Sequence, residues 1–94
     1  MPVEIVWSPL ARARLSEIRA YIALDNPDAA ERVAMRIVAL VETLKNFPHL
    51  GRPGAEPGVR ELVISGTPYI VIYRVRGDRI TVNTIWHGAQ RREP

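Results

Sequence analysis

The sequence predicts an α+β fold in which a hairpin of two helices packs on one face of a small, mainly antiparallel sheet. Residues 9–46 repeat apolar side chains at helical spacing and are interrupted once, by an Asn-Pro pair. Residues 59–86 then hold three runs rich in β-branched and aromatic residues, joined by two short turns that contain Gly. A short β run precedes the helices, so the expected order is β-α-α-β-β-β.

The first strand is expected over residues 3–7, a run of high β propensity. Ser8 and Pro9 then supply a helix N-cap followed by proline at the first helical position. Apolar residues recur after this point at spacings of four, three and four, which is the pattern of a helix with one buried face. The stripe consists of Ala11, Leu15, Ile18 and Ile22.

A second helix is predicted from the repeat of the same start signal. Asn26 is the expected cap, Pro27 occupies the first turn, and the helix runs to about Asn46. Its stripe consists of Ala30, Val33, Ala34, Ile37, Val41 and Leu44. Because the two stripes match, the helices should pair as a hairpin.

Three strands are expected after a surface connection over residues 47–58, which holds three Pro and three Gly. The strands span residues 59–65, 69–75 and 80–86, and their turns are short enough for antiparallel hairpins. The middle strand is apolar on both faces, with Ile70 and Ile72 opposite Tyr69 and Tyr73. Either the sheet curls around its own residues, or a second polypeptide covers the face that the helices leave open.

The composition indicates one globular domain over residues 1–94 with a thin core. Zero cysteines exclude disulfides, thiolate catalysis and Cys-based zinc sites, and with only two His we expect neither a metal site nor a cofactor. No run approaches the ~18 apolar residues of a membrane span. The N-terminus, with Glu4, has no signal-peptide pattern, so we expect a cytoplasmic protein without a membrane partner.

The positive charge lies in the last third of the chain. Residues 1–58 hold seven basic and seven acidic side chains, whereas residues 59–94 hold six Arg and three acids, which gives the net charge of +3. Arg60 and Arg74 fall on neighbouring strands, and Arg91 and Arg92 follow the last one. These side chains could bind phosphate or carboxylate groups together, or they could form an ordinary solvated strand end.

Candidate catalytic residues are few. His87, at the end of a strand, is the one candidate general acid or base in the basic segment whose ordinary pKa lies near neutral pH. A His at a strand end is more often a hydrogen-bonded packing residue than a catalyst. Tyr69 and Tyr73 could stack on bases or fill the core. No P-loop, GxGxxG, HExxH or GxSxG motif occurs. A metal-independent ribonuclease built on His87, Arg60 and Arg74 would still lack an evident second proton carrier.

Several segments together resemble the RelE/ParE superfamily of type II toxin-antitoxin toxins. The segments are Asn26-Pro27 with Ala29-Ala30, Pro48-His49-Leu50-Gly51-Arg52, Gly58-Val59-Arg60-Glu61-Leu62, Tyr69-Ile70-Val71-Ile72-Tyr73-Arg74-Val75, and His87-Gly88 with Arg91. The resemblance covers essentially the whole chain and rests on the order and spacing of the segments. It implies a small toxin that a cognate, ParD-like antitoxin neutralises in a hetero-oligomer.

The resemblance also implies an antitoxin-binding surface. We expect the antitoxin to cover apolar side chains of the helical hairpin and of the middle strand. These are Leu15, Ile18, Ile22, Val33, Ile37, Ile70 and Ile72.

The branch of the superfamily decides the expected target. RelE-like ribonucleases use a Lys-rich set and a C-terminal Tyr, which this chain lacks, and another ribonuclease branch uses a Glu, an Arg and a His that correspond loosely to Glu61, Arg74 and His87. The GVREL strand, the Asn-Pro junction and the His-Gly ending look more like ParE, whose members poison DNA gyrase.

We therefore favour the hypothesis that the protein is a toxin that acts on DNA gyrase. Its expected target-binding residues are Arg60, Arg74, His87, Arg91 and Arg92. The alternatives are a ribosome-dependent mRNA endoribonuclease that uses His87, Arg74, Arg60 and Glu61, and a non-toxic module that only binds the antitoxin.

Overall fold

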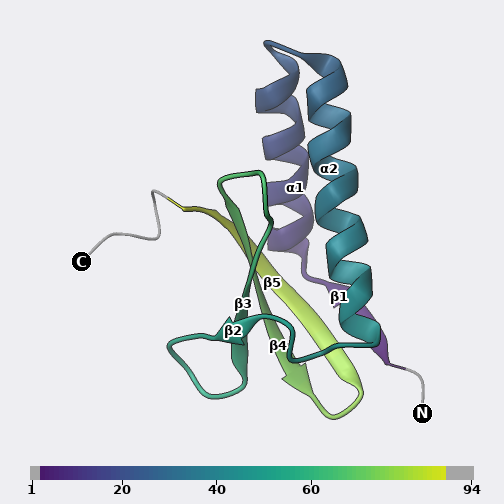
Figure 1. The fold of residues 1–94 in the computed structure, drawn as a ribbon, viewed down its shortest axis with the longest axis vertical. Helices are drawn as coiled ribbons and strands as arrows, with labels where there is room; N and C mark the ends of the chain where they lie inside the picture. Colours follow the sequence, from purple (N-terminus) through teal and green to yellow (C-terminus); the bar gives the residue numbers. More distant parts are fainter. Residues whose placement is uncertain (1–2, 89–94) are drawn as a thin grey trace.

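A computed structural model describes residues 3–88 and has the predicted fold, two helices on one face of a sheet (Figure 1). The elements are β1 (Glu4–Trp7), α1 (Pro9–Ala23), α2 (Pro27–Glu42), the 3-10 turn η1 (Thr43–Lys45), β2 (Arg52–Pro53), β3 (Val59–Val63), β4 (Tyr69–Arg76) and β5 (Arg79–His87). Both predicted caps are present. The side chains of Ser8 and Asn26 accept the backbone N–H of the residue three positions on, and proline follows each cap.

The sheet has five strands in the order β1-β5-β4-β3-β2. β1 runs parallel to β5, and the other pairs are antiparallel. One strand was missed by the sequence prediction: Arg52 and Pro53, inside the expected connection, pair with Glu61 and Arg60. β3 also ends at Val63, two residues earlier than predicted.

The core fills the space between the hairpin and the helix-covered face of the sheet. It combines Ala11, Ile37, Val41 and Leu44 with Leu62, Ile64, Tyr69, Val71, Tyr73, Ile80, Val82 and Ile85. The interpretation of Tyr69 and Tyr73 as packing residues is therefore confirmed, since both rings are buried there. In Figure 1 the far end of the hairpin extends past the sheet.

The other face of the sheet, here called the open face, carries no helix within residues 3–88. Ile70 and Ile72 are nevertheless only 8% and 6% exposed. Ile72 lies beside Ala55 of the connection and beside Trp86, so the chain's own residues cover much of this face. The sequence left open whether the chain's own residues or a second polypeptide would cover this face. For these two isoleucines the chain's own residues do so, and the middle strand does not by itself require a partner.

A β-bulge at Asn83 decides which side chains of β5 reach each face. Tyr73 pairs with Val82, but Ile72 pairs with Thr84, which leaves Asn83 as the extra residue. The alternation of side chains reverses at this point, so Ile85 and His87 join the helix-covered face while Trp86 lies on the open face.

Ser8 anchors this bulge to the start of α1. Its hydroxyl donates to the carbonyl oxygen of Asn83 at 2.7 Å while accepting the N–H of Ala11 at 3.0 Å, and its own N–H donates to Val82 O at 3.0 Å. One side chain thus caps the helix and binds the irregular strand. Among residues 3–88, no helix is long and apolar enough to cross a bilayer.

We expect Ser8→Ala to lower the free energy of unfolding by about 2 kcal/mol, because both the helix cap and the bond to the bulge are lost. The matched control is Asn26→Ala, which removes a cap with no partner on the sheet and should cost about 1 kcal/mol. Urea denaturation measures both values. An equal loss in the two variants would show that the bond to Asn83 adds nothing to stability.

Candidate functional site

The buried hydroxyl of Tyr73 fixes the loop formed by residues 48–51, here called the clamped loop. Tyr73 Oη accepts the N–H of Gly51 at 2.9 Å and donates to the carbonyl oxygen of Pro48 at 2.8 Å. Any Cβ at position 51 would lie 2.8 Å from Tyr73 Oη and from the backbone oxygen of Glu61, so only glycine fits. The loop is therefore held against the central strand by two buried hydrogen bonds and by close contact.

Burial raises the pKa of the Tyr73 hydroxyl above its ordinary value, and the Gly51 N–H and the charge of Arg60 oppose this rise only in part. The phenol thus keeps its proton at neutral pH. A neutral hydroxyl is required here because only the protonated form donates to Pro48 O.

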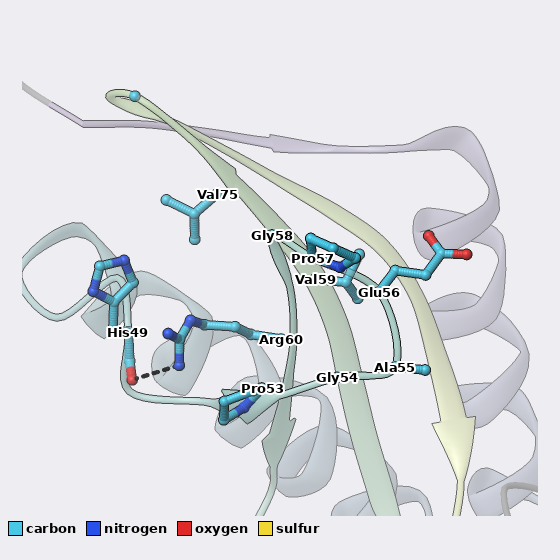
Figure 2. A pocket seen from close by; sticks show the side chains of 11 residues that line it. His49, Pro53, Gly54, Ala55, Glu56, Pro57, Gly58, Val59, Arg60 and Val75 are labelled. Atoms are coloured by element: carbon cyan, nitrogen blue, oxygen red, sulfur yellow. Dashed lines mark hydrogen bonds between the residues drawn. The ribbon is translucent and has the colours of Figure 1, made fainter.

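Arg60 lies beside the clamped loop because β3 places it directly opposite Tyr73. Its Nη1 donates to the carbonyl oxygens of Gly51 at 2.7 Å and His49 at 3.4 Å. Arg60 and His49 border a cavity of about 540 Å³, here called the loop hollow, whose other walls are residues 53–59, Val75 and Gly77. Figure 2 shows the Arg60 guanidinium and the His49 ring on the same side of this hollow.

Among the described residues, the open face carries three ion pairs, and the one between Arg79 and Glu4 lies at its β1 edge. The carboxylate of Glu61, 5% exposed as a residue, lies 3.1 Å from Arg52 Nε. Arg74 Nη2 lies 3.5 Å from Glu56, and its Nη1 donates to Pro57 O at 3.4 Å. These opposite charges flank a groove that Ile72, Asn83, Thr84 and Trp86 also line. The charges on this face therefore largely cancel.

His87 lies far from Arg60 and Arg74. It pairs with Tyr69 at one end of β4, and its ring meets the Tyr69 ring edge-on with centroids 5.6 Å apart. Arg74 is five residues along the same strand, about 16 Å away. The bulge places His87 on the helix-covered face, in a cavity lined by Arg14, Glu17, Ile18 and Tyr21.

The predicted target-binding residues consequently do not converge among the described residues. Arg60 and Arg74 project from opposite faces of the sheet, since Arg60 pairs with Tyr73 and Arg74 pairs with Val59. His87 occupies a third place. Arg91 and Arg92 lie outside the described residues. The residues expected for the endoribonuclease alternative are also divided between the faces. Glu61 and Arg74 lie on the open face, whereas Arg60 and His87 lie on the helix-covered face.

Three of the seven predicted antitoxin-binding residues are buried, and the other four are partly buried. Ile37 has no exposed surface, and Ile70 and Ile72 are nearly buried. Leu15, Ile18, Ile22 and Val33 are partly buried and pack on the core.

The hairpin instead exposes side chains that the sequence reasoning missed. Met35 is 63% and Val38 40% exposed, and together with Trp7 and Leu15 they line a groove of about 640 Å³, here called the hairpin groove. Arg19 and Glu31, 2.7 Å apart, close one edge of it. The i, i+3 spacing of Met35 and Val38 beside the main stripe was the available sequence signal.

No group of three His, Cys, Asp or Glu side chains within residues 3–88 is arranged to hold a metal ion.

Residues 5–92 match the family model described as the ParE toxin of the type II toxin-antitoxin system parDE. The chain belongs to the ParE toxin family. This ParE-family protein is 45% identical to the protein Y4kP of Sinorhizobium fredii over 92% of its own length and 88% of that protein's. It is 36% identical to the toxin RelE2 of Caulobacter vibrioides, with 93% and 97% of the two chains covered.

Solved structures agree with this assignment. A chain of the chromosomal ParDE toxin-antitoxin system from P. aeruginosa superposes on the ParE-family protein with a TM-score of 0.79 at 31% identity, covering 90% of this chain and 95% of that one. A chain of the RelBE2 toxin-antitoxin complex from Mycobacterium tuberculosis has a TM-score of 0.61 at 20% identity, with 93% and 99% covered, which shows the shared fold. The chain is thus a toxin of the ParE/RelE family of type II systems.

We expect Tyr73→Phe to lower the free energy of unfolding by about 2 to 4 kcal/mol, because Gly51 N–H and Pro48 C=O lose a buried partner. Tyr21→Phe, at an exposed ring, is the matched control and should change stability by less than about 0.5 kcal/mol. Urea denaturation at pH 7 gives both values. A loss below about 1 kcal/mol for Tyr73→Phe would contradict the clamp.

The pH dependence follows from the raised pKa values. The folded protein holds the Tyr73 proton more tightly than the unfolded chain does, so this contribution is complete below the unfolded pKa of about 10 and is lost as the pH rises through the folded value. Burial also raises the pKa of Tyr69. Tyr73→Phe should therefore weaken, without abolishing, the fall in stability between neutral and strongly alkaline pH, as measured by urea denaturation at each pH.

Proposed function

We propose that the protein is a ParE-like inhibitor of DNA gyrase that a cognate antitoxin neutralises. Support comes from the family match over nearly the whole chain and from the similarity to the ParDE structure. The observation that carries the choice of target is the separation of the potential acid-base groups. Glu61 lies on the open face and His87 on the helix-covered face.

The separation disfavours a ribonuclease built on these residues. Metal-independent RNA cleavage needs a base and an acid that both reach one phosphodiester within hydrogen-bond distance. Glu61 is already paired with Arg52. An RNA-binding surface also needs excess positive charge, whereas the open face pairs Arg52 and Arg74 with glutamates and exposes the apolar side chains Val63 and Trp86. A gyrase inhibitor requires no such constellation.

The antitoxin partner is proposed from the hairpin groove and from the relatives. The similar structures come from a ParDE toxin-antitoxin system and a RelBE2 toxin-antitoxin complex. The groove offers Trp7, Met35 and Val38 as an apolar floor, with Arg12 and Arg19 at its margin. An amphipathic antitoxin helix with acidic flanks would fit this surface, giving a toxin-antitoxin hetero-oligomer.

A gyrase assay with purified protein freed of antitoxin tests the proposed target. We expect loss of supercoiling with accumulation of cleaved DNA covalently linked to gyrase, while a ribosome-dependent translation mixture keeps its mRNA intact. Cleaved mRNA with unaffected gyrase would contradict the proposal and favour the endoribonuclease. Absence of both effects, and of growth arrest on expression, would leave a non-toxic antitoxin-binding module.

The hairpin groove predicts the effect of a charge placed in it. We expect Val38→Glu to weaken binding of the antitoxin encoded beside the toxin by about tenfold or more, because a carboxylate would be buried against apolar surface. The matched control is Leu24→Glu, at an 83% exposed side chain that does not line the groove. Calorimetric titration compares the two variants. Equal affinities would place the antitoxin elsewhere.

A further inference from the structure

We propose that the loop hollow binds one phosphate group through Arg60 and His49. We further infer, resting on the proposed function, that the group is a backbone phosphodiester of the DNA that gyrase holds. This proposal assigns Arg60 to a different site from Arg74 and His87, with which it was grouped in the sequence analysis. His49, to which the sequence assigned no role, becomes part of the site.

The orientation of the Arg60 guanidinium favours an oxyanion. Both carbonyl bonds are made by Nη1, to Gly51 O and His49 O. Within residues 3–88 this leaves the edge formed by Nε and Nη2, which carries the other three N–H donors of the group. Two parallel N–H bonds from such an edge match the spacing of two oxygens of a phosphate.

The charge of Arg60 is not neutralised by its observed hydrogen-bond partners. Arg52, Arg74 and Arg79 each lie beside a glutamate, at 3.1, 3.5 and 3.3 Å. Arg60 instead bonds to backbone carbonyls, which fix its position without cancelling its charge. A partly buried cation held in this way attracts an anion more strongly than one already paired with a carboxylate.

The walls of the loop hollow suit a tetrahedral group. The exposed His49 ring and the Arg60 guanidinium both line the hollow, Val75 forms an apolar wall, and Glu56, which also lines it, points away from both basic side chains (Figure 2). The Glu56 carboxylate lies by Arg74 at 3.5 Å. A phosphate can accept from the guanidinium edge and from an imidazole N–H at once, because its oxygens point in different directions.

The Arg60 guanidinium is also held in place before any ligand arrives. Tyr73 holds the clamped loop, and the loop carbonyls hold Arg60. Binding therefore spends little free energy on ordering this side chain.

The test is an NMR titration of the full chain, first with inorganic phosphate and then with a dinucleotide that carries a single phosphodiester, at constant ionic strength. We expect saturable shifts of the Arg60 Nε–H and the His49 ring with both probes, and none with chloride. His49→Ala should weaken binding about tenfold. Arg60→Lys keeps the positive charge but loses the two parallel N–H donors of the guanidinium edge, so it should weaken phosphate binding at least as much.

The matched control is Arg76→Gln, which removes an exposed charge near the end of the same sheet without lining the loop hollow. Its affinity for phosphate should equal that of the wild type. Equal weakening by Arg76→Gln and His49→Ala would overturn the site, since it would show general attraction to a basic protein. Absence of saturable shifts at Arg60 in the folded wild type would overturn it as well.

The gyrase assay separates this proposal from the function on which its DNA ligand rests. Saturable phosphate binding without gyrase inhibition would overturn the function and leave the phosphate site standing. Gyrase inhibition without phosphate binding would overturn the phosphate site and leave the proposed function standing. Binding of inorganic phosphate but not of the dinucleotide, with His49→Ala still fully inhibitory, would overturn DNA as the source of the phosphate.

Discussion

The hydrogen bonds of one buried phenol organise the part of the molecule around β2 and β3. Tyr73 stands on the central strand, and its hydroxyl ties down the clamped loop at Pro48 and Gly51. β2 begins at the next residue, Arg52, which pairs with Glu61 in the sheet and through its side chain. The same loop supplies the carbonyls that hold Arg60. Edge strand, buried carboxylate and oriented guanidinium all depend on the position of this loop.

A second constraint, the bulge at Asn83, decides what the two faces of the sheet can do. If side chains alternated regularly through Asn83, His87 would share a face with Arg74, and an acid-base pair on the open face would be geometrically reasonable. With the bulge, His87 packs against Tyr69 beside α1, and Trp86 lies on the open face instead. A single-residue irregularity thus favours a toxin that acts by binding over one that cleaves RNA with these side chains.

The sequence predicted the features that local chemistry determines. Ser8 and Asn26 each precede a proline, and a cap bonds only three residues ahead, so both helix starts were readable. β2 could not be predicted in this way, because Arg52 and Pro53 form a strand only by pairing with distant residues. The bulge depends on a bond between Ser8 and Asn83, which are 75 residues apart. The sequence alone therefore could not show whether the basic side chains lie together, because that depends on how the strands pair with one another.

Amide hydrogen exchange at Gly51 tests most directly whether Tyr73 fixes the clamped loop. This N–H lies in a loop, yet its acceptor is a buried side chain. We expect Gly51 to exchange only through global unfolding, as slowly as the amides of β4. Exchange as fast as that of exposed loop amides would show that the loop opens independently, and would contradict an oriented Arg60 and the site built on it.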